Sequence, residues 1–263
     1  MRDQGAPEAV FVDRARSGGD SPGEQPPARR SVTDVTLYGH WICPYSVRVS
    51  FALAERGIVH DVVDVPPTAV RPAGFVVPDE FVAHSPLGEI PMVRVDGEYR
   101  ADSLPILEWL EERVDAPPLL PSDPSTRLRV LELMTLIDRR VFPPMIGVYY
   151  GTHVDRIAES ADALATALAE LGAGLDGSPW LAGTGPTLAE ATLVPFYVRL
   201  DGLRRLGFDR DLDPRIADHR LRAGDLAGGR AVAWSSSRTE EFVTRFERHR
   251  AVRRSTTGGP EPR

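Results

Sequence analysis

The sequence predicts a small α/β unit followed by a unit built only from helices. Three observations support this fold class. An apolar strand, Val35–Tyr38, leads into an amphipathic helix that begins at Pro44. The pair Asp96-Gly97 stands between two strand-like runs and signals a two-residue hairpin. After the proline-rich stretch 116–124, the pattern of apolar residues is helical almost throughout.

The α/β unit is expected over residues 34–115. Its first helix, Pro44–Arg56, opens on a proline because the first turn does not need that residue's missing N–H. Val47 and Phe51 lie on one apolar face of this helix, which stops at Gly57. The other elements are expected in the order strand His60–Val65, helix Asp79–His84, strand Ile90–Val95, strand Glu98–Ala101 and helix Ser103–Val114.

The helical unit is expected over residues 125–252, after a linker at 116–124. The linker holds four prolines in nine residues, which cannot continue a helix. The long apolar patterns that follow favour a bundle of antiparallel neighbours with short connections. The expected helices are Ser125–Ile137 with a continuation past Pro143-Pro144 to about Tyr150, Asp155–Leu175, Thr187–Leu206, a less regular one within Pro214–Ala227, and Arg238–Val252.

Both ends of the chain differ in composition from the two units. Residues 1–33 and 253–263 are rich in Gly, Pro, Arg and Ser and show no periodicity. Segments of this kind bury too little apolar surface to offset the entropy lost on ordering. Both are therefore expected to be disordered tails.

The composition excludes several classes of function. A formal net charge of −7 argues against nucleic-acid partners, because contacts with phosphates require a basic face. All 31 basic residues are arginine, so neither a Schiff-base lysine nor a lysine-bearing phosphate loop exists. The 6 histidines are scattered and have no cysteine partners at zinc-site spacing, so no metal is expected.

The same data predict a cytoplasmic protein without a membrane partner. No apolar run reaches the ~20 residues that a membrane span needs, and the N-terminus lacks a secretory apolar stretch. A single cysteine forms no internal disulfide, which agrees with a reducing compartment.

That single cysteine, Cys43, lies where the first strand has ended and the helix at Pro44 begins. The start of a helix offers unpaired N–H donors and the positive end of the peptide dipoles, and both favour a thiolate over a thiol. We therefore expect a reactive cysteine with a lowered pKa. The alternative is a small, inert core residue, since free cysteines are often fully buried.

Four motifs in this order resemble the glutathione transferase superfamily, over roughly residues 34–250. The run Cys43-Pro-Tyr-Ser-Val-Arg48 is similar to the Cys-Pro-Phe-Ala-x-Arg signature of omega-type members and dehydroascorbate reductases. The segment around Ile90-Pro91 and the pair Asp102-Ser103 are similar to the family's thiol-binding segments. Thr187-Leu-Ala-Glu190 resembles its buried capping box, with glutamate in place of the usual aspartate.

The resemblance implies a thioredoxin-like N-terminal domain, an all-helical C-terminal domain and a homodimer. The dimer would pair the first two bundle helices with the α/β body of the other subunit. Cys43 would be catalytic, a cis Pro91 and the backbone of Ile90 would align the thiol cofactor, and Asp102 and Ser103 would hold its amino-acid end. The cofactor would be glutathione or another low-molecular-weight thiol.

Two departures from the family pattern affect this site. Asp102 is one methylene shorter than the usual glutamate, and the lysine that often meets the cofactor's glycine carboxylate does not occur in this chain. Arg71 and Arg48 are the candidates for that lysine's role by their positions alone.

The main functional hypothesis is thiol transfer by Cys43 to a small electrophile, or reduction of a disulfide through a mixed disulfide. Thiol-dependent cis–trans isomerisation and conjugation use the same pocket and stay open, as does a binding scaffold without turnover. The residues expected near the substrate are Tyr38, Ser46, Met145, Ile146, Tyr149 and Tyr150. For all of them except Ser46, which lies near Cys43 by sequence, packing in the core is the competing interpretation.

Overall fold

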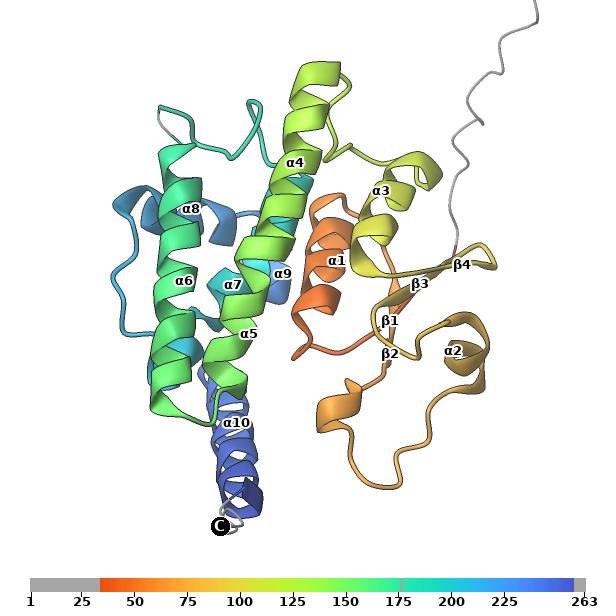
Figure 1. Ribbon diagram of the computed structural model, residues 1–263. Helices are drawn as coiled ribbons and strands as arrows, with labels where there is room; N and C mark the ends of the chain where they lie inside the picture. Colours follow the sequence, from red (N-terminus) through yellow and green to blue (C-terminus); the bar gives the residue numbers. More distant parts are fainter. Residues whose placement is uncertain (1–33, 176, 258–263) are drawn as a thin grey trace, which may run out of the picture.

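The computed structural model describes residues 34–175 and 177–257 and confirms the predicted fold class (Figure 1). A mixed sheet with three α-helices comes first in the chain, and only helices follow. The expected tail 1–33 lies outside the described residues, as do residues 258–263. The last helix continues to Thr257, five residues beyond the predicted end at Val252 and into the range expected to be a tail.

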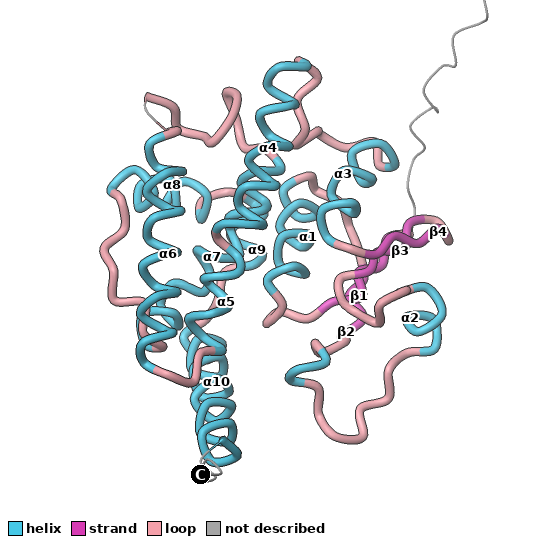
Figure 2. Tube along the Cα trace, in the orientation of Figure 1, coloured by secondary structure: helices cyan, strands magenta, loops and turns pink. Residues whose placement is uncertain are grey.

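The sheet has four strands in the order β2-β1-β3-β4 (Figure 2). The strand β1 lies parallel to β2 and antiparallel to β3, and β3 pairs with β4 through the predicted hairpin. The two hairpin residues Asp96 and Gly97 have φ values of 46° and 83°, as a primed two-residue turn requires. The strands are β1 Val35–Gly39, β2 Asp61–Asp64, β3 Met92–Val95 and β4 Glu98–Ala101.

Helices cover both faces of this sheet (Figure 1). The helices α1 and α3 lie between the sheet and the helical part, and α2 lies on the opposite side. The residues between β2 and α2 form an irregular connection with one 3₁₀ turn, which borders the site described below. The elements are α1 Pro44–Glu55, the 3₁₀ turn Thr68–Val70, α2 Asp79–His84 and α3 Ser103–Arg113.

Seven helices make up the described C-terminal part of the chain. The expected continuation of the first helix is a separate helix, because two prolines occupy its opening turn and the chain bends at Val141. The less regular segment splits in two after Gly224, and the short second helix contains Gly228 and Gly229, which are weak helix formers. The helices are α4 Pro124–Arg140, α5 Phe142–Tyr150, α6 Val154–Ala173, α7 Leu188–Arg205, α8 Pro214–Gly224, α9 Ala227–Val232 and α10 Ser236–Thr257.

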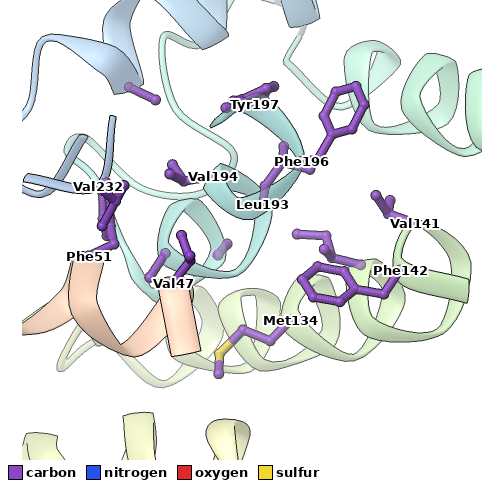
Figure 3. Packing of buried hydrophobic residues seen from close by; sticks show 14 of the residues in the cluster. Val47, Phe51, Met134, Val141, Phe142, Leu193, Val194, Phe196, Tyr197 and Val232 are labelled. Carbon is purple, nitrogen blue, oxygen red and sulfur yellow. The ribbon is translucent and has the colours of Figure 1, made fainter. Parts of the chain in front are cut away.

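One apolar core connects the two parts of the molecule (Figure 3). Val47 of α1 lies toward Val194 of α7 and Phe51 of α1 lies beside Val232 of α9, and all four side chains are buried. Since α1 also packs on α9, the helix that begins at Pro44 contacts two helices of the C-terminal part. None of the described helices combines the length and apolar character that crossing a bilayer would demand.

The contact of α9 with α1 gives a prediction about stability. A Cβ added at Gly228 would lie 2.6 Å from the carbonyl oxygen of Phe51, so the two helices would have to separate. Gly228→Ala is expected to lower the free energy of unfolding by about 1–3 kcal/mol. At Gly224 a Cβ meets nothing within 4 Å. Gly224→Ala is the matched control, and denaturant titrations in which both variants behave alike would contradict the proposed close approach.

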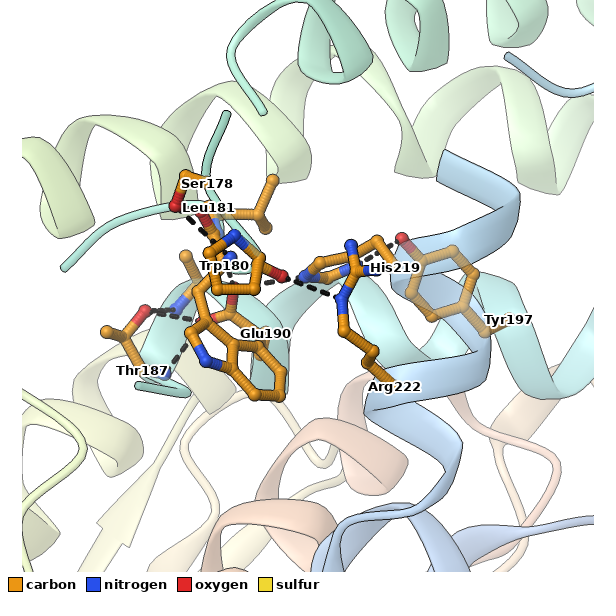
Figure 4. Close-up of polar contacts among 10 residues, drawn as sticks. Ser178, Trp180, Leu181, Thr187, Glu190, Tyr197, His219 and Arg222 are labelled. Carbon is orange, nitrogen blue, oxygen red and sulfur yellow. Dashed lines mark hydrogen bonds and ion pairs between the residues drawn. The ribbon is translucent and has the colours of Figure 1, made fainter. Parts of the chain in front are cut away.

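A buried polar network holds the start of α7 (Figure 4). The carboxylate of Glu190 accepts hydrogen bonds from the backbone N–H and the hydroxyl of Thr187, both at 2.7 Å, and from the N–H of Leu181 at 2.8 Å. His219 contacts the same carboxylate at 3.2 Å and the hydroxyl of Tyr197 at 2.7 Å. The predicted capping box of Thr187 and Glu190 is confirmed.

Candidate active site

Cys43 is the residue immediately before α1, as expected, and only 6% of it is exposed. Its backbone N–H donates to the carbonyl of His40 at 3.0 Å, and its thiol donates to the carbonyl of Ile90 at 3.9 Å. The neighbouring N–H of Ile42 donates to Nδ1 of His40 at 3.1 Å. The loop that carries the cysteine is therefore fixed by its own hydrogen bonds, and its thiol touches the segment that contains Pro91.

The expectation of a lowered cysteine pKa is wrong for this structure. Burial raises the pKa of the Cys43 thiol, because the surroundings solvate a thiolate less well than water does. The backbone and hydroxyl of Ser46, the charge of Arg199 and the backbone of Tyr45 lower the pKa and offset burial only in part. The sequence showed the helix start, but it did not show how deeply the sulfur lies.

A first pocket brings together the residues expected to bind the thiol cofactor. It has a volume of about 640 Å³, and Ile90, Pro91, Asp102 and Ser103 all line it. The predicted cis bond between Ile90 and Pro91 is present. Asp102 precedes α3 with a φ of 70°, and its carboxylate makes no capping hydrogen bond to that helix. This acidic side chain is thus available to a positively charged group in the pocket.

A second cavity of about 220 Å³ lies beside the first and contains Cys43. Tyr149 and Tyr150 line it, together with Ile146, as expected for the substrate side. Tyr45, Glu89 and Ile90 belong to both spaces and form the wall between them. The cysteine therefore lies in a mixed cavity that includes the rings of Tyr149 and Tyr150, next to the larger pocket.

Three of the expected substrate residues do not line either space. Tyr38 is a core tyrosine, and its hydroxyl donates to Glu80. Met145 is fully buried in the main core. Ser46 is buried behind the cysteine, where its hydroxyl accepts from the N–H of His40 at 3.4 Å. For Tyr38 and Met145, the structure supports the competing interpretation of core packing. Ser46 lines neither space, but its hydroxyl acts on the thiol of Cys43.

The two arginine candidates for the cofactor's glycine carboxylate lie in different places. Arg71 lines the cavity that contains Cys43. Arg48 is fully buried and donates to the hydroxyl of Ser103 at 3.2 Å and to the carboxylate of Asp138 at 2.9 Å. Arg48 already bonds to Ser103 of α3 and to Asp138 of α4. Only Arg71 therefore remains a candidate for binding the glycine carboxylate.

Sequence reasoning missed two residues at this site. Phe246 of α10 lines the cysteine cavity, and it contacts Phe242 one turn before it at 4.9 Å between ring centres. Arg199 of α7 is buried, and its charge acts on the cysteine. The signal for Phe246 was an aromatic pair at i, i+4, and the signal for Arg199 was a lone arginine in the apolar run 188–200. Over the ranges that the structure describes, no three His, Cys, Asp or Glu side chains gather as a metal site would require.

Family models match both parts of the chain. The N-terminal domain of glutathione S-transferase matches residues 42–113, and the C-terminal domain matches residues 154–222. A maleylacetoacetate isomerase of Pseudomonas aeruginosa is 30% identical over 199 residues, which cover 73% of this chain and 90% of that protein. A probable maleylacetoacetate isomerase 1 of Drosophila melanogaster is 33% identical over 121 residues, 45% of this chain. That match spans about half, 48%, of the fly protein's length.

Solved structures agree with the fold. A glutathione transferase Omega 3C from Trametes versicolor matches with a TM-score of 0.70 at 20% identity, over 84% of this chain and 93% of that one. At this identity the likeness concerns the fold alone. A maleylacetoacetate isomerase from Methylobacterium extorquens, solved with bound malonate and GSH, matches with a TM-score of 0.61 at 26% identity, over 74% of this chain and 95% of that one. The chain therefore belongs to the glutathione S-transferase family.

Proposed function

We propose that the protein is a glutathione-dependent thiol transferase in which Cys43 is the nucleophile. One observation supports this most directly. Cys43 lines the smaller cavity, and its thiol lies 3.9 Å from the carbonyl of Ile90, a residue shared with the pocket that Asp102 and Ser103 also line. A thiol peptide in that pocket and a small substrate in the cavity would both reach the sulfur.

The residues of the larger pocket fit glutathione. Its γ-glutamyl end carries an ammonium group and a carboxylate. The carboxylate of Asp102 would pair with the ammonium, and the first N–H groups of α3 would bind the carboxylate. The backbone of Ile90 would align the peptide, much as one strand pairs with another. Arg71 would meet the glycine carboxylate from the cavity side.

The proposed reaction is thiol–disulfide exchange at Cys43. Its thiolate would attack one sulfur of a small disulfide, so that a new S–S bond forms and the other sulfur leaves as a thiolate and takes up a proton. When bound, glutathione supplies the second thiol, which regenerates Cys43. Tyr149, Tyr150 and Phe246 would exclude water from the apolar side of the substrate. Because burial raises the pKa of Cys43, the rate should increase from pH 7 towards pH 9 as the thiolate fraction grows.

Glutathione-dependent cis–trans isomerisation is the second candidate. The similarity to the Pseudomonas isomerase over 90% of its length favours it. In this reaction a thiol adds to a double bond, the bond rotates and the thiol leaves. The cavity beside Cys43 has one basic residue, Arg71, in its lining, and a charged substrate would depend on that residue.

One experiment separates the candidates. The protein is incubated with glutathione disulfide and its intact mass is measured, and the reduction of a small disulfide and the isomerisation of maleylacetoacetate are assayed in parallel. Thiol transfer predicts one added glutathionyl group on Cys43 and disulfide reduction. Isomerisation alone, without the adduct, would replace the first proposal by the second. Neither activity, together with no retention on immobilised glutathione, would refute both.

The role proposed for Asp102 gives a second prediction. Asp102→Asn removes the charge that would meet the ammonium group of glutathione, and a charge-assisted hydrogen bond is worth about 1.5–3 kcal/mol. We expect the KM for glutathione to rise about tenfold or more. Glu108→Asn is the matched control, because Glu108 is exposed on the same helix and lines neither space. Equal KM values for both variants would remove Asp102 from the cofactor site.

We also propose a homodimer in the cytoplasm. The family resemblance suggests that α4 and α6 of one subunit pack on the α/β part of the other, and Leu128 of α4 is a large apolar residue with 59% exposure. A reducing compartment would keep Cys43 available as a thiol. Sedimentation at micromolar concentration should give twice the chain mass of 28.8 kDa, and a monomer mass would refute the dimer.

A further inference from the structure

Arg199 is a buried cation with an unusual set of partners. None of its surface is exposed, and its guanidinium donates to the carbonyls of Pro195 at 2.7 Å and Ile42 at 2.8 Å. It also lies over the ring of Trp234, with 5.0 Å to the ring centre. Its Nε has no hydrogen-bond partner, and within residues 34–175 and 177–257 no carboxylate pairs with it. A full positive charge inside the protein is costly without an anion nearby.

The position of Arg199 points to Cys43 as the missing anion. Arg199 donates a hydrogen bond to the carbonyl of Ile42, the residue directly before the cysteine. Its charge acts on Cys43, and the anionic forms of Tyr149 and Cys43 both act favourably on the arginine, Tyr149 more strongly. Burial lowers the pKa of Arg199 to about 10, so the side chain still carries its charge at neutral pH.

Two charged side chains, Arg71 and Glu89, line the same cavity as Cys43, but neither is among the main groups that shift the pKa of the thiol. The remaining groups around Cys43 do not supply an unpaired positive charge. Arg48 of α1 interacts with the cysteine, but it is paired with Asp138 at 2.9 Å. Tyr45 of α1 and Tyr149 and Tyr150 of α5 also interact with it, and burial raises the pKa of all three tyrosines, so they are neutral at neutral pH. Ser46 contributes hydrogen bonds without a charge.

We infer that Arg199 is a positioning residue whose buried charge stabilises the thiolate of Cys43 and whose hydrogen bond to Ile42 fixes the loop before it. The inference rests on the proposed role of Cys43 as nucleophile. In the thiol state the cation is unbalanced. Loss of the cysteine proton creates an ion pair inside the protein, which partly offsets the burial that disfavours the thiolate.

The test measures alkylation of Cys43 by iodoacetamide from pH 6 to 10. The reaction forms a thioether and releases iodide, and Cys43 is the only cysteine in the chain, so the adduct reports on one site. Arg199→Gln keeps a donor for the Ile42 carbonyl and removes the charge. We expect the midpoint of its rate profile to move to higher pH, with a rate at pH 7 about threefold to tenfold lower, as for a shift of half a pKa unit to one unit. Arg199→Lys should recover most of the rate.

Arg250 provides the matched control. It is a buried arginine that donates to two backbone carbonyls, those of Val148 and Leu206, and its Nε also has no partner. Cys43 is not among the groups that shift the pKa of Arg250. Arg250→Gln should leave the midpoint unchanged. A midpoint that stays constant in Arg199→Gln, with only the plateau rate reduced, would show a purely structural role and overturn the inference.

A second measurement leaves Arg199 in place, in case Arg199→Gln does not fold. Cys43→Asp puts a permanent negative charge at the position of the sulfur, and Cys43→Asn is its neutral match. Beside an unpaired cation, the aspartate variant should melt at or above the temperature of the asparagine variant. A clearly lower melting temperature for Cys43→Asp would overturn the inference. None of these readouts needs turnover, so a protein that proves inactive with glutathione would refute the proposed function without deciding the role of Arg199.

Discussion

Replacing Cys43 with serine is expected to abolish thiol transfer while the fold stays nearly unchanged. A hydroxyl cannot form a mixed disulfide, and its oxygen is almost fully protonated at neutral pH, so disulfide reduction should fall to the uncatalysed background. The stability should change little, because serine is close in size, favours the position before a helix and can donate to the carbonyl that Cys43 now contacts. We expect a loss below about 2 kcal/mol.

The measurement combines a disulfide-reduction assay with thermal unfolding. Ser50→Ala serves as the control, because Ser50 lies on the same helix, is partly exposed and lines neither space. A serine variant that unfolds readily would show that Cys43 is a packing residue. A folded variant with full thiol-transfer activity would mean that the cofactor's own sulfur does the chemistry. That result would favour conjugation or isomerisation.

Replacing Glu190 with alanine is expected to cause the largest loss of stability. The carboxylate is fully buried and has four polar partners on Leu181, Thr187 and His219 (Figure 4). Removing it leaves two backbone N–H groups, a hydroxyl and an imidazole in the protein interior without this partner. Breaking a buried network from one side costs about 3–5 kcal/mol.

Two further variants show whether the cost comes from the network. Glu190→Asp keeps the charge and is the residue that the family resemblance suggests, so it should lose clearly less than alanine. Glu108→Ala removes a carboxylate from an exposed position of α3 and should stay within about 0.5 kcal/mol of the wild type. Denaturant titration gives all three values. A loss of under about 1 kcal/mol in Glu190→Ala would show that water or a neighbour replaces the carboxylate.

Much of the fold could be predicted because local signals agreed with one another. Pro44, Gly57 and the pair Asp96-Gly97 mark helix starts, helix ends and turns through their backbone preferences alone. The separate helix at α9 was missed for the same reason, since Gly228 and Gly229 disfavour a helix. In the structure, Gly228 lets this helix pack closely on Phe51 of α1, and Gly229 lets it pack closely on Ala223 of α8.

The candidate site could also be predicted only in part. Motif order indicated residues that the structure puts in two adjoining spaces, with Ile90, Asp102 and Ser103 in the larger pocket and Cys43 in the cavity beside it, since each motif fixes a backbone position. The pKa of Cys43 depends on burial by distant helices, which a helix-start argument does not contain. Arg199 lies 156 positions after Cys43 in the chain, so only the tertiary structure brings the arginine to the cysteine.

The wall shared by the two spaces links the binding of two ligands thermodynamically. Tyr45, Glu89 and Ile90 face both the larger pocket and the cysteine cavity, so a ligand that orders them on one side changes the free energy of binding on the other. Such a coupling is reciprocal: if the thiol raises the affinity for the substrate by some factor, the substrate raises the affinity for the thiol by the same factor. Calorimetric titrations in both orders should therefore give equal factors. The order in which the two ligands arrive would then affect the rates of assembly but not the stability of the ternary complex.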